Sequence, residues 1–306
     1  MILCYSIIAK RREKRNFMIY LLIGDIMELV DGKIIQKKFL KELKKEVDLF
    51  GYFKEIAVIS TGDNLLEGAY FKAIQSMSQK MGFPIRKMHF DYISETKLLL
   101  LIDQLNVDCN VSGILVMHPL IDGINEKKVR EKICPKKDIE GLNYYYGFKN
   151  TYPELYLPCT ALGIIMFLEE LHISLVGKNI IILNRSPRIG LPLLNYFLKQ
   201  NVDVTICHRH TDNQTLLKNA DIIISALGKP NHIDSRILKK DSIIIDAGMC
   251  VVDEKIVGDI EFHQESLAKY YLSPTNGVGS FTTMALANNI YISYYLNQED
   301  KDYPLF

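Results

Sequence analysis

Two polar segments follow short apolar runs in the second half of the chain, and their side chains are of the kind that binds phosphate. Asn179 to Leu183 is typical of a buried strand, and Asn184-Arg185-Ser186-Pro187-Arg188 comes directly after it. Val202 to Cys207 is a second such run and ends in His208-Arg209-His210-Thr211. Between them, Gly190 opens an apolar-periodic stretch that predicts a helix. This order predicts a βαβ unit, and the N-terminus of its helix is a natural seat for phosphate.

The glycines of the first turn do not form the usual dinucleotide fingerprint. That fingerprint, G-x-G-x-x-G, needs three glycines, and the turn contains only Gly190. An ordinary α/β packing unit that binds no ligand is the alternative on these residues alone.

The residues around both turns resemble the methylenetetrahydrofolate dehydrogenase/cyclohydrolase family. Its members carry G-R-S-x-x-V-G-x-P at the first turn and C-H-S/R-x-T after the next strand; here Asn184 replaces the first glycine. Asparagine tolerates unusual backbone angles better than most residues, so the turn can still form. The resemblance runs from Met27 to Asn289. Further matching segments in the family's order are Gly62-Asp63-Asn64, Gly113 to Val116, Lys137 to Gly141, Pro158-Cys159-Thr160, Gly228-Lys229-Pro230, Asp246-Ala247-Gly248, Gly258 to Phe262 and Gly277-Val278-Gly279.

The resemblance implies a tetrahydrofolate substrate and assigns roles residue by residue. The family tyrosine that lies against the pterin corresponds to Tyr70, and the catalytic lysine four residues later corresponds to Ile74. The glutamine of V-Q-L-P corresponds to Met117, and the pterin-binding aspartate of K-D-V-D-G corresponds to Glu140. The implied substrate-binding set is Tyr70, Met117, Pro119, Glu140 and Gly277.

The departures at two of these positions bear on catalysis. Ile74 has no proton to exchange, and Met117 cannot make the hydrogen bonds of a glutamine. Lys72 lies about 200° round the helix from Tyr70 and cannot substitute. We expect Tyr70 and Glu140 to support hydride transfer, and the cyclohydrolase step to be much reduced. Without the resemblance, Tyr70, Ile74 and Met117 would be interpreted as core residues, and Glu140 as a solvated charge.

The resemblance places the nicotinamide cofactor in the second half of the chain. We expect NADP rather than NAD, because Arg185 and Arg209 suit a dianionic 2′-phosphate and no acidic residue ends the second strand to hold a free ribose hydroxyl. The expected cofactor-binding residues are Asn184, Arg185, Ser186, Ile189, Gly190, His208, Arg209, Thr211, Gly228 and Met249.

The elements that must position these residues predict an α/β fold. Strand-like runs alternate with helical periodicity, and the resemblance implies two α/β domains around a cleft, the second with a Rossmann-like doubly wound parallel sheet. We expect a folate-binding domain over 27–150, completed by a C-terminal helix over 281–300, and a nucleotide-binding domain over 151–280. Residues 1–26 are interpreted as an extension, poorly ordered or added by an upstream start codon, that folding does not need.

Composition excludes several other classes. Lys and Arg number 37 against 36 Asp and Glu, so the chain lacks the basic excess of a nucleic-acid-binding protein. The six cysteines form no C-x-x-C pair, which argues against a structural metal and a disulfide framework. No apolar run reaches transmembrane length. We expect a cytoplasmic protein, a homodimer as the resemblance implies, with a small-molecule substrate.

Three hypotheses remain open on the sequence. The first is an NADP-dependent methylenetetrahydrofolate dehydrogenase with an impaired cyclohydrolase step. The second is the full bifunctional enzyme, which also converts the methenyl product to 10-formyltetrahydrofolate. The third is an inactive paralogue that binds folate or nucleotide or serves in assembly.

Overall fold

The computed structural model describes residues 20–23, 27–48, 53–62, 65–146, 156–208, 210–211 and 214–298. They fall into two compact units. Unit 1 lies within Phe39–Cys159 and Leu286–Phe306, and unit 2 within Asn16–Lys38 and Thr160–Ala285. The chain therefore passes from one unit to the other inside helices α2 (Gly32–Val47) and α10 (Ser280–Gln298) and at the start of α7 (Cys159–Glu170).

Unit 1 contains a three-stranded parallel sheet in the order β4-β3-β5. Its strands are β3 (Glu55–Thr61), β4 (Ile85–Phe90) and β5 (Val111–Val116). Its complete helical elements are α3 (Leu65–Met81), α4 (Glu95–Val107), α5 (Glu126–Lys132), the 3-10 turn Pro135–Lys137 and α6 (Asn143–Tyr146).

Local signals fix the helices of unit 1, and burial fixes its central strands. Ser94 and Asn125 cap α4 and α5, because their side chains accept from the N–H of Lys97 and Lys128. Strand β5 is buried at every residue, as expected of a parallel strand covered on both faces. One core cluster packs strand residues against α4 and α5: Ala57, Ile59, Ile93, Leu98, Ile102, Leu105, Val111, Ile114, Val116, Val129 and Ile133.

The C-terminal part of α10 is tied to unit 1 by buried amide and hydroxyl groups. Asn289 donates from Nδ2 to the carbonyls of Ile139 and Leu157, at 2.9 and 3.1 Å. Ser293 donates to the carbonyl of Ser112 on β5. These bonds join residues that are more than 100 positions apart in the sequence.

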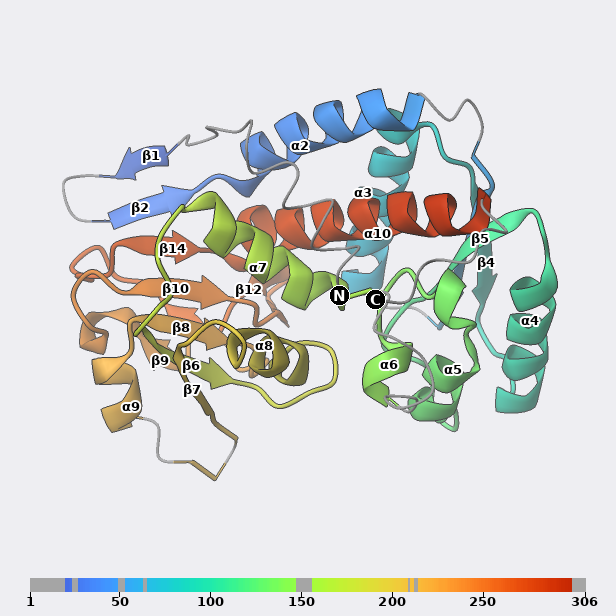
Figure 1. Ribbon diagram of the computed structural model, residues 1–306. Helices are drawn as coiled ribbons and strands as arrows, with labels where there is room; N and C mark the ends of the chain where they lie inside the picture. The colour runs from blue at the N-terminus through green and yellow to red at the C-terminus, as the bar shows by residue number, and fades with distance from the viewer. Residues whose placement is uncertain are drawn as a thin grey trace. The chain divides into compact units, whose positions relative to one another are not determined.

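Unit 2 contains a seven-stranded sheet in the order β1-β2-β14-β10-β8-β6-β7 (Figure 1). All neighbouring pairs are parallel except β1 (Tyr20–Ile23) with β2 (Met27–Val30). The other strands are β6 (Asn179–Leu183), β7 (Asp203–Ile206), β8 (Ile222–Ser225), β10 (Ile243–Asp246) and β14 (Tyr270–Leu272). Chain order within the sheet reverses beside β6, so the predicted doubly wound parallel sheet is confirmed.

Helices and short sheets complete unit 2. Helix α8 (Gly190–Phe197) connects β6 to β7, and α9 (Gln214–Asn219) connects β7 to β8. The remaining elements are β9 (Ile233–Asp234), the 3-10 turn Ser235–Ile237, β11 (Cys250–Val252), β12 (Lys255–Val257), β13 (Ile260–Glu261) and the π-helical turn Pro274–Gly279.

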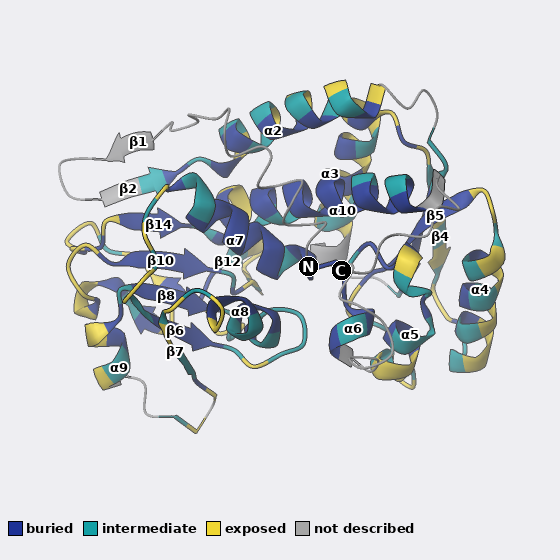
Figure 2. Ribbon diagram, viewed as in Figure 1, coloured by how far each residue is buried: buried dark blue, intermediate teal, exposed yellow. Residues whose placement is uncertain are grey.

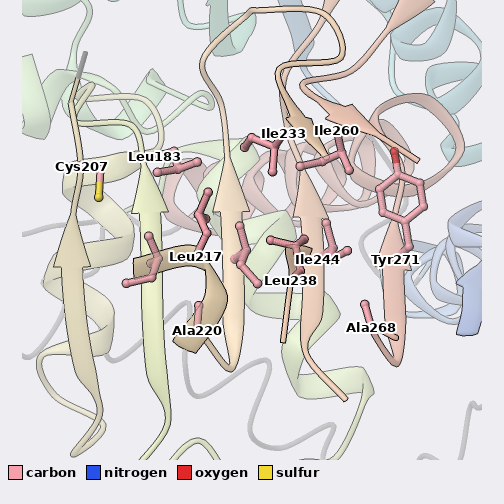
Figure 3. Packing of buried hydrophobic residues seen from close by; sticks show 12 residues of the cluster. Leu183, Cys207, Leu217, Ala220, Ile233, Leu238, Ile244, Ile260, Ala268 and Tyr271 are labelled. Atoms are coloured by element: carbon pink, nitrogen blue, oxygen red, sulfur yellow. The ribbon is translucent and has the colours of Figure 1, made fainter. Parts of the chain in front are cut away.

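The core of unit 2 follows the alternation of side chains along its strands. Figure 3 shows Leu183, Ile244 and Tyr271 on adjacent or nearby strands, with Leu217 and Ala220 from the α9 region on the same face. The central strands are dark blue throughout in Figure 2, which marks them as buried.

Strands β1 and β2 belong to the seven-stranded sheet of unit 2. Residues 20–23, assigned to a dispensable extension, form β1 and pair with β2. Strand β2 itself, expected to open the folate-binding domain, pairs with β14 in the sheet of unit 2. A long-range strand pairing of this kind leaves no local mark in the sequence.

Among the described residues, no helix combines the length and the apolar character needed to cross a membrane.

Candidate active site

The first group of candidate residues lies at the carboxyl end of the unit 1 sheet. Because β3, β4 and β5 are parallel, the segments that follow them meet at one edge. Met117 follows β5, is 2% exposed, and donates its N–H to the carbonyl of Ile59 at 2.8 Å. Pro119, exposed, follows a cis peptide bond with His118. A parallel bridge between Ile114 and Asp138 aligns Glu140 with the same end of β5.

Helix α3 presents Tyr70 and Ile74 one turn apart. Tyr70 is half-buried, whereas Ile74 is fully buried together with Met77 and Met81. Lys72 is exposed, as its position on the helix predicts. The position that corresponds to a lysine in the resemblance is therefore an apolar core position here, with no group that can exchange a proton.

Glu140 is held by a buried arginine that the sequence did not single out. Arg130, on α5, has a fully buried side chain, and its Nη1 donates to Oε2 of Glu140, whose side chain is 11% exposed. The Nε of Arg130 donates to Oε1 of Glu126 at 3.3 Å. His118 Nδ1 lies 3.5 Å from the same Glu126 oxygen. A guanidinium between two carboxylates fixes the orientation of Glu140 and offsets its charge.

Asp138, two residues before Glu140, is buried and titrates unusually. Its Oδ2 accepts from the N–H of Asn143 at 2.6 Å, and its Oδ1 has no hydrogen-bond partner among the described residues. Burial raises the pKa of this carboxyl to about 6, and the neighbouring charge of Glu140 acts in the same direction. Asp138 can therefore change its protonation state near neutral pH.

Lys137 is buried but serves the fold rather than the site. Its Nζ donates to the carbonyls of Leu105 and Asp108, at 2.9 and 2.8 Å, where α4 ends. Burial lowers the pKa of its ammonium. Both bonds hold the amine at the amino-terminal side of β5, so it cannot replace the missing lysine.

Two histidines lie near this edge. His89, at the end of β4, has its Nδ1 2.9 Å from Oγ of Ser60 and its Nε2 3.2 Å from Oδ1 of Asp91. The other is His118, beside Glu126. Both imidazoles are partly exposed, with 37% and 47% of their side chains accessible.

The second group of candidate residues lies at the carboxyl end of the unit 2 sheet. The strand order puts the switch point between β6 and β8, the usual place for a ligand in such sheets. Asn184 follows β6 and spans this point: its Nδ2 donates to the carbonyl of Ala226, after β8, at 2.8 Å. Its Oδ1 accepts from the N–H groups of Ser186 and Gly190, at 2.8 and 3.1 Å.

The turn into α8 is tight. A Cβ atom on Gly190 would lie 2.0 Å from the carbonyl oxygen of Asn184, so only glycine fits. The N–H of Ile189 donates to Oγ of Ser186 at 3.3 Å. Arg185 is exposed beside them.

The segment after β7 supplies one histidine and one threonine. The N–H of His208 donates to Oγ1 of Thr211 at 3.1 Å, and the N–H of Thr211 donates back to the carbonyl of His208 at 2.9 Å. Arg209, which we expect to contact a 2′-phosphate, lies outside the described residues.

Two buried aspartates fasten the loops after β8 and β10. Asp259 accepts from the hydroxyl of Ser225 at 2.7 Å and from the N–H groups of Leu227 and Lys229, at 2.6 and 2.8 Å. These bonds bracket Gly228, which is exposed and has a φ of 67°. Asp259 lies in the matching segment Gly258 to Phe262, but the resemblance assigns it no role.

Asp246, at the end of β10, is the second of these two aspartates. Its Oδ1 accepts from the N–H groups of Gly248 and Asp259, and its Oδ2 accepts from the N–H of Ile260, all near 3.0 Å. Burial raises the pKa of Asp246 to about 6, and burial together with Asp246 raises the pKa of Tyr271. Met249, just beyond, is 49% exposed.

Gly277 lies in the turn before α10. It is buried, and a Cβ there would meet Leu272 at 2.8 Å. Gly32 packs against the same turn, since its Cβ would lie 2.5 Å from the carbonyl oxygen of Asn276. The turn is therefore closely packed within unit 2.

Comparison with known proteins identifies both halves of the chain. Residues 30–140 match the family model described as the tetrahydrofolate dehydrogenase/cyclohydrolase catalytic domain, and residues 158–298 match its NAD(P)-binding domain. The chain is 36% identical over 270 residues to the bifunctional protein FolD of Halalkalibacterium halodurans, covering 86% of this chain and 97% of that one. It is 35% identical over 269 residues to that of Bacillus subtilis, covering 85% and 95%.

Solved structures give the same result. The bifunctional FolD enzyme of Campylobacter jejuni is 32% identical, with a TM-score of 0.79, covering 88% of this chain and 99% of that one. The 5,10-methylenetetrahydrofolate dehydrogenase of the silkworm Bombyx mori is 28% identical, with a TM-score of 0.80, covering 89% and 99%.

Proposed function

Because the chain belongs to the tetrahydrofolate dehydrogenase/cyclohydrolase family, we propose that it oxidises 5,10-methylenetetrahydrofolate to the methenyl form with NADP and hydrolyses that product slowly. The observation that carries the proposal is the burial of Ile74 and Met117, which puts apolar side chains where the resemblance has a lysine and a glutamine.

Hydride transfer does not depend on a side chain that donates or accepts a proton. Hydride leaves a carbon flanked by two nitrogens whose lone pairs stabilise the resulting cation, so the step mainly requires the reactants to be held in register. Tyr70 and Glu140 would hold the pterin, with Arg130 orienting Glu140. Bound NADP supplies the hydride acceptor.

The residues at the carboxyl end of the unit 2 sheet fit an NADP molecule. Arg185 is exposed after β6, and His208 and Thr211 follow the neighbouring strand β7. Gly228 and Met249 are exposed on loops held by Asp259 and Asp246. Two arginines, Arg185 and Arg209, suit the 2′-phosphate. The preference is tested by comparing kcat/KM for NADP and NAD: a clear preference for NAD, or an Arg209→Ala variant that loses nothing with NADP, contradicts it.

Hydrolysis of the methenyl product needs water to attack and protons to move. A positioned acid or base typically contributes about 10²–10⁴-fold to such a step. We therefore expect enzyme-dependent decay of methenyltetrahydrofolate to be slower than hydride transfer by a factor in this range. The measurement follows methenyltetrahydrofolate decay beside the dehydrogenase assay, and rapid enzyme-dependent hydrolysis would contradict the proposal.

A double variant sharpens this test. Ile74→Lys with Met117→Gln restores the two side chains of the resemblance and should raise hydrolysis. Both positions are buried, so thermal unfolding must be measured alongside to show that the variant folds. The matched control is Ile237→Lys, which introduces the same ammonium at an exposed isoleucine.

The full bifunctional enzyme is the second candidate, favoured by the similarity to bifunctional FolD proteins and by two accessible imidazoles. If the natural chain hydrolyses the methenyl compound rapidly, His89 and His118 are the groups to replace. Loss of hydrolysis in His89→Gln or His118→Gln, with dehydrogenase activity kept, would assign the proton transfer. Absence of both activities in the natural chain would favour the inactive paralogue.

Two properties of the assembly complete the proposal. We propose a homodimer, which light scattering on the purified chain tests directly; the exposed side chains of Val251 and Val252 on the β11–β12 hairpin offer apolar surface for it. We also propose a cytoplasmic location, tested by imaging the tagged chain in its own cells.

A further inference from the structure

We propose that Cys109 and Cys134 are a modification site, a thiol pair that a small disulfide such as oxidised glutathione converts into an intrachain disulfide bond. The pair lies in unit 1 at the amino-terminal side of β5, whereas the candidate active site lies at the carboxyl end of the same sheet. This chemistry goes beyond the proposed reaction with folate and does not depend on it.

The side chain of Asn106 holds the two cysteine-bearing segments together. The N–H of Cys134 donates to Oδ1 of Asn106 at 2.8 Å, and Nδ2 of Asn106 donates to the carbonyl of Lys132 at 2.8 Å. Asn106 lies in the last turn of α4, three residues before Cys109. One carboxamide therefore ties the segment that leads into Cys134 to the end of the helix that leads into Cys109.

The side chain of Lys137 makes a second link between these segments. Its N–H donates to the carbonyl of Cys134 at 2.8 Å, so the two residues share one turn. Its Nζ donates to the carbonyl of Asp108, the residue before Cys109, at 2.8 Å, and to the carbonyl of Leu105 at 2.9 Å. Lys137 is 7% exposed, so its ammonium lies in the interior between the two cysteine-bearing turns.

The ammonium of Lys137 is close enough to both thiols to interact with them electrostatically. Burial lowers the pKa of this ammonium, whereas Cys134, Asp108 and Cys109 act to raise it and Lys54 acts to lower it. An ammonium has three N–H donors, and the two carbonyls accept from it without neutralising its charge. A positive charge beside a thiol stabilises the thiolate, which is the nucleophile in thiol–disulfide exchange.

The two thiols differ in exposure, and this sets the order of the reaction. Both are free; Cys109 is exposed and Cys134 is half-buried. Cys109 loses its proton, and its thiolate attacks one sulfur of oxidised glutathione, forms a mixed disulfide and releases one glutathione. Cys134 then loses its proton, attacks the Cys109 sulfur and releases the second glutathione. The two thiols are oxidised, and one glutathione disulfide is reduced to two molecules of glutathione.

Cys250, in unit 2, is the matched thiol for comparison. It is free and half-buried, as Cys134 is. Burial raises the pKa of its thiol, and the carboxylates of Asp259 and Asp246 act in the same direction. A thiol beside negative charge forms less thiolate, so we expect Cys250 to react with oxidised glutathione more slowly than Cys109.

The experiment treats the reduced full-length chain with oxidised glutathione and follows the products by mass spectrometry. We expect a product that is lighter than the reduced chain by two hydrogen atoms, and peptide mapping without reduction should join the peptides of Cys109 and Cys134. Dithiothreitol should restore the reduced mass. The proposal is overturned if the chain does not react, if it accumulates only glutathione adducts, or if the crosslink maps to other cysteines. These readouts are masses, so they remain valid if the proposed enzymatic function fails.

Serine variants separate the roles of the two thiols. In Cys134→Ser the attack by Cys109 is not followed by a second step, so an adduct with one glutathione should accumulate. In Cys109→Ser this fast adduct should be lost together with the crosslink. Cys250→Ser is the control and should form the crosslink at the natural rate. A Cys134→Ser chain that forms no adduct at Cys109 contradicts the proposed order of attack.

The role of the ammonium is tested at Lys137 itself. Lys137→Gln removes the positive charge and should slow formation of the crosslink about three- to tenfold, because less thiolate is present. Lys137→Arg keeps the charge and should react at close to the natural rate. Thermal unfolding shows whether each variant folds, and the serine variants decide the proposal if either does not. An unchanged rate in a folded Lys137→Gln chain contradicts the role of the ammonium.

Discussion

Buried charged side chains have different roles at the carboxyl ends of the two sheets. In unit 2, buried aspartates accept from backbone N–H groups of the loops after β8 and β10 and so hold the loops in place. In unit 1, a buried guanidinium holds a carboxylate that belongs to the candidate site itself. The first arrangement shapes loops of unit 2, whereas the second fixes an ionisable group at the edge where we propose that the substrate binds.

This difference matches the two steps of the proposed reaction. Hydride transfer needs rigid positioning, which both arrangements provide. Hydrolysis needs proton exchange at the unit 1 edge, where Ile74 and Met117 provide none. Four predictions test the comparison, from the largest expected effect to the smallest.

Replacing Arg130 by methionine should have the largest effect on stability. The change leaves the carboxylates of Glu140 and Glu126 without their buried cation, and breaking a buried ion pair from one side costs about 3–5 kcal/mol. Urea unfolding measures it. Arg236→Met is the matched control, because Arg236 pairs with Asp234 at the surface, where an ion pair contributes little to stability. Equal losses of unfolding free energy in both variants would show that the buried ion pairs of Arg130 stabilise the fold no more than a surface pair does.

Replacing Asp259 by asparagine should weaken unit 2 by about 1–3 kcal/mol, because an amide nitrogen would then face N–H donors of Leu227 or Lys229. NADP affinity should fall with it, since these bonds set the loop around Gly228. Calorimetry with NADP and urea unfolding measure the two effects. Asp241→Asn, at an exposed aspartate, is the control and should change neither. Unchanged NADP affinity in Asp259→Asn would show that the hydrogen bonds of this aspartate do not affect cofactor binding.

The raised pKa of Asp138 makes stability depend on pH. Its folded pKa of about 6 lies above the ordinary value, so the folded state binds more protons between about pH 4 and 6. The contribution to stability is therefore present below that window and lost as the pH rises through it. An Asp138→Asn variant stays neutral, so relative to the natural chain it should gain up to about 2–3 kcal/mol between pH 4 and 7.5. If the unfolding free energies of the two proteins change with pH in parallel, the raised pKa of Asp138 is contradicted.

Truncation at Met27 should have the smallest effect. It removes β1, an antiparallel edge strand that pairs with β2, while the parallel strands of the sheet remain. We expect a loss of about 1 kcal/mol or less in unfolding free energy, as for a few edge contacts. Thermal unfolding of chains that begin at Tyr20 and at Met27 separates β1 from the residues before it. A loss of several kcal/mol at Met27 would show that the hairpin is needed for the sheet.

Local patterns were sufficient for much of the fold. Short, mostly apolar runs such as Ile222–Ser225 and Ile243–Asp246 are strands, buried at four successive residues as expected of a parallel sheet covered on both faces. The burial of Ile74, Met77 and Met81 follows from their spacing on α3. Motif order was sufficient for the family.

Partners distant in sequence could not be predicted. Arg130 carries no signal of burial, since arginine is ordinarily exposed, and an Arg–Glu spacing of four on α5 is typical of a solvated helix. Asn184 was noticed only as a departure from glycine. Its side-chain bonds depend on Ala226, 42 positions away, which strand pairing brings beside it.

The amino-acid sequence by itself determined the α/β class, the family and the loss of a lysine and a glutamine, because side-chain chemistry at fixed spacing is a local property. Tertiary structure alone decided that β2 belongs to the sheet of unit 2, that Arg130 orients Glu140, and that Asn184 closes the first turn of α8. The physical reason is that strand pairing and buried charge compensation are contacts between segments, and the free energy of each depends on which groups the completed fold brings together.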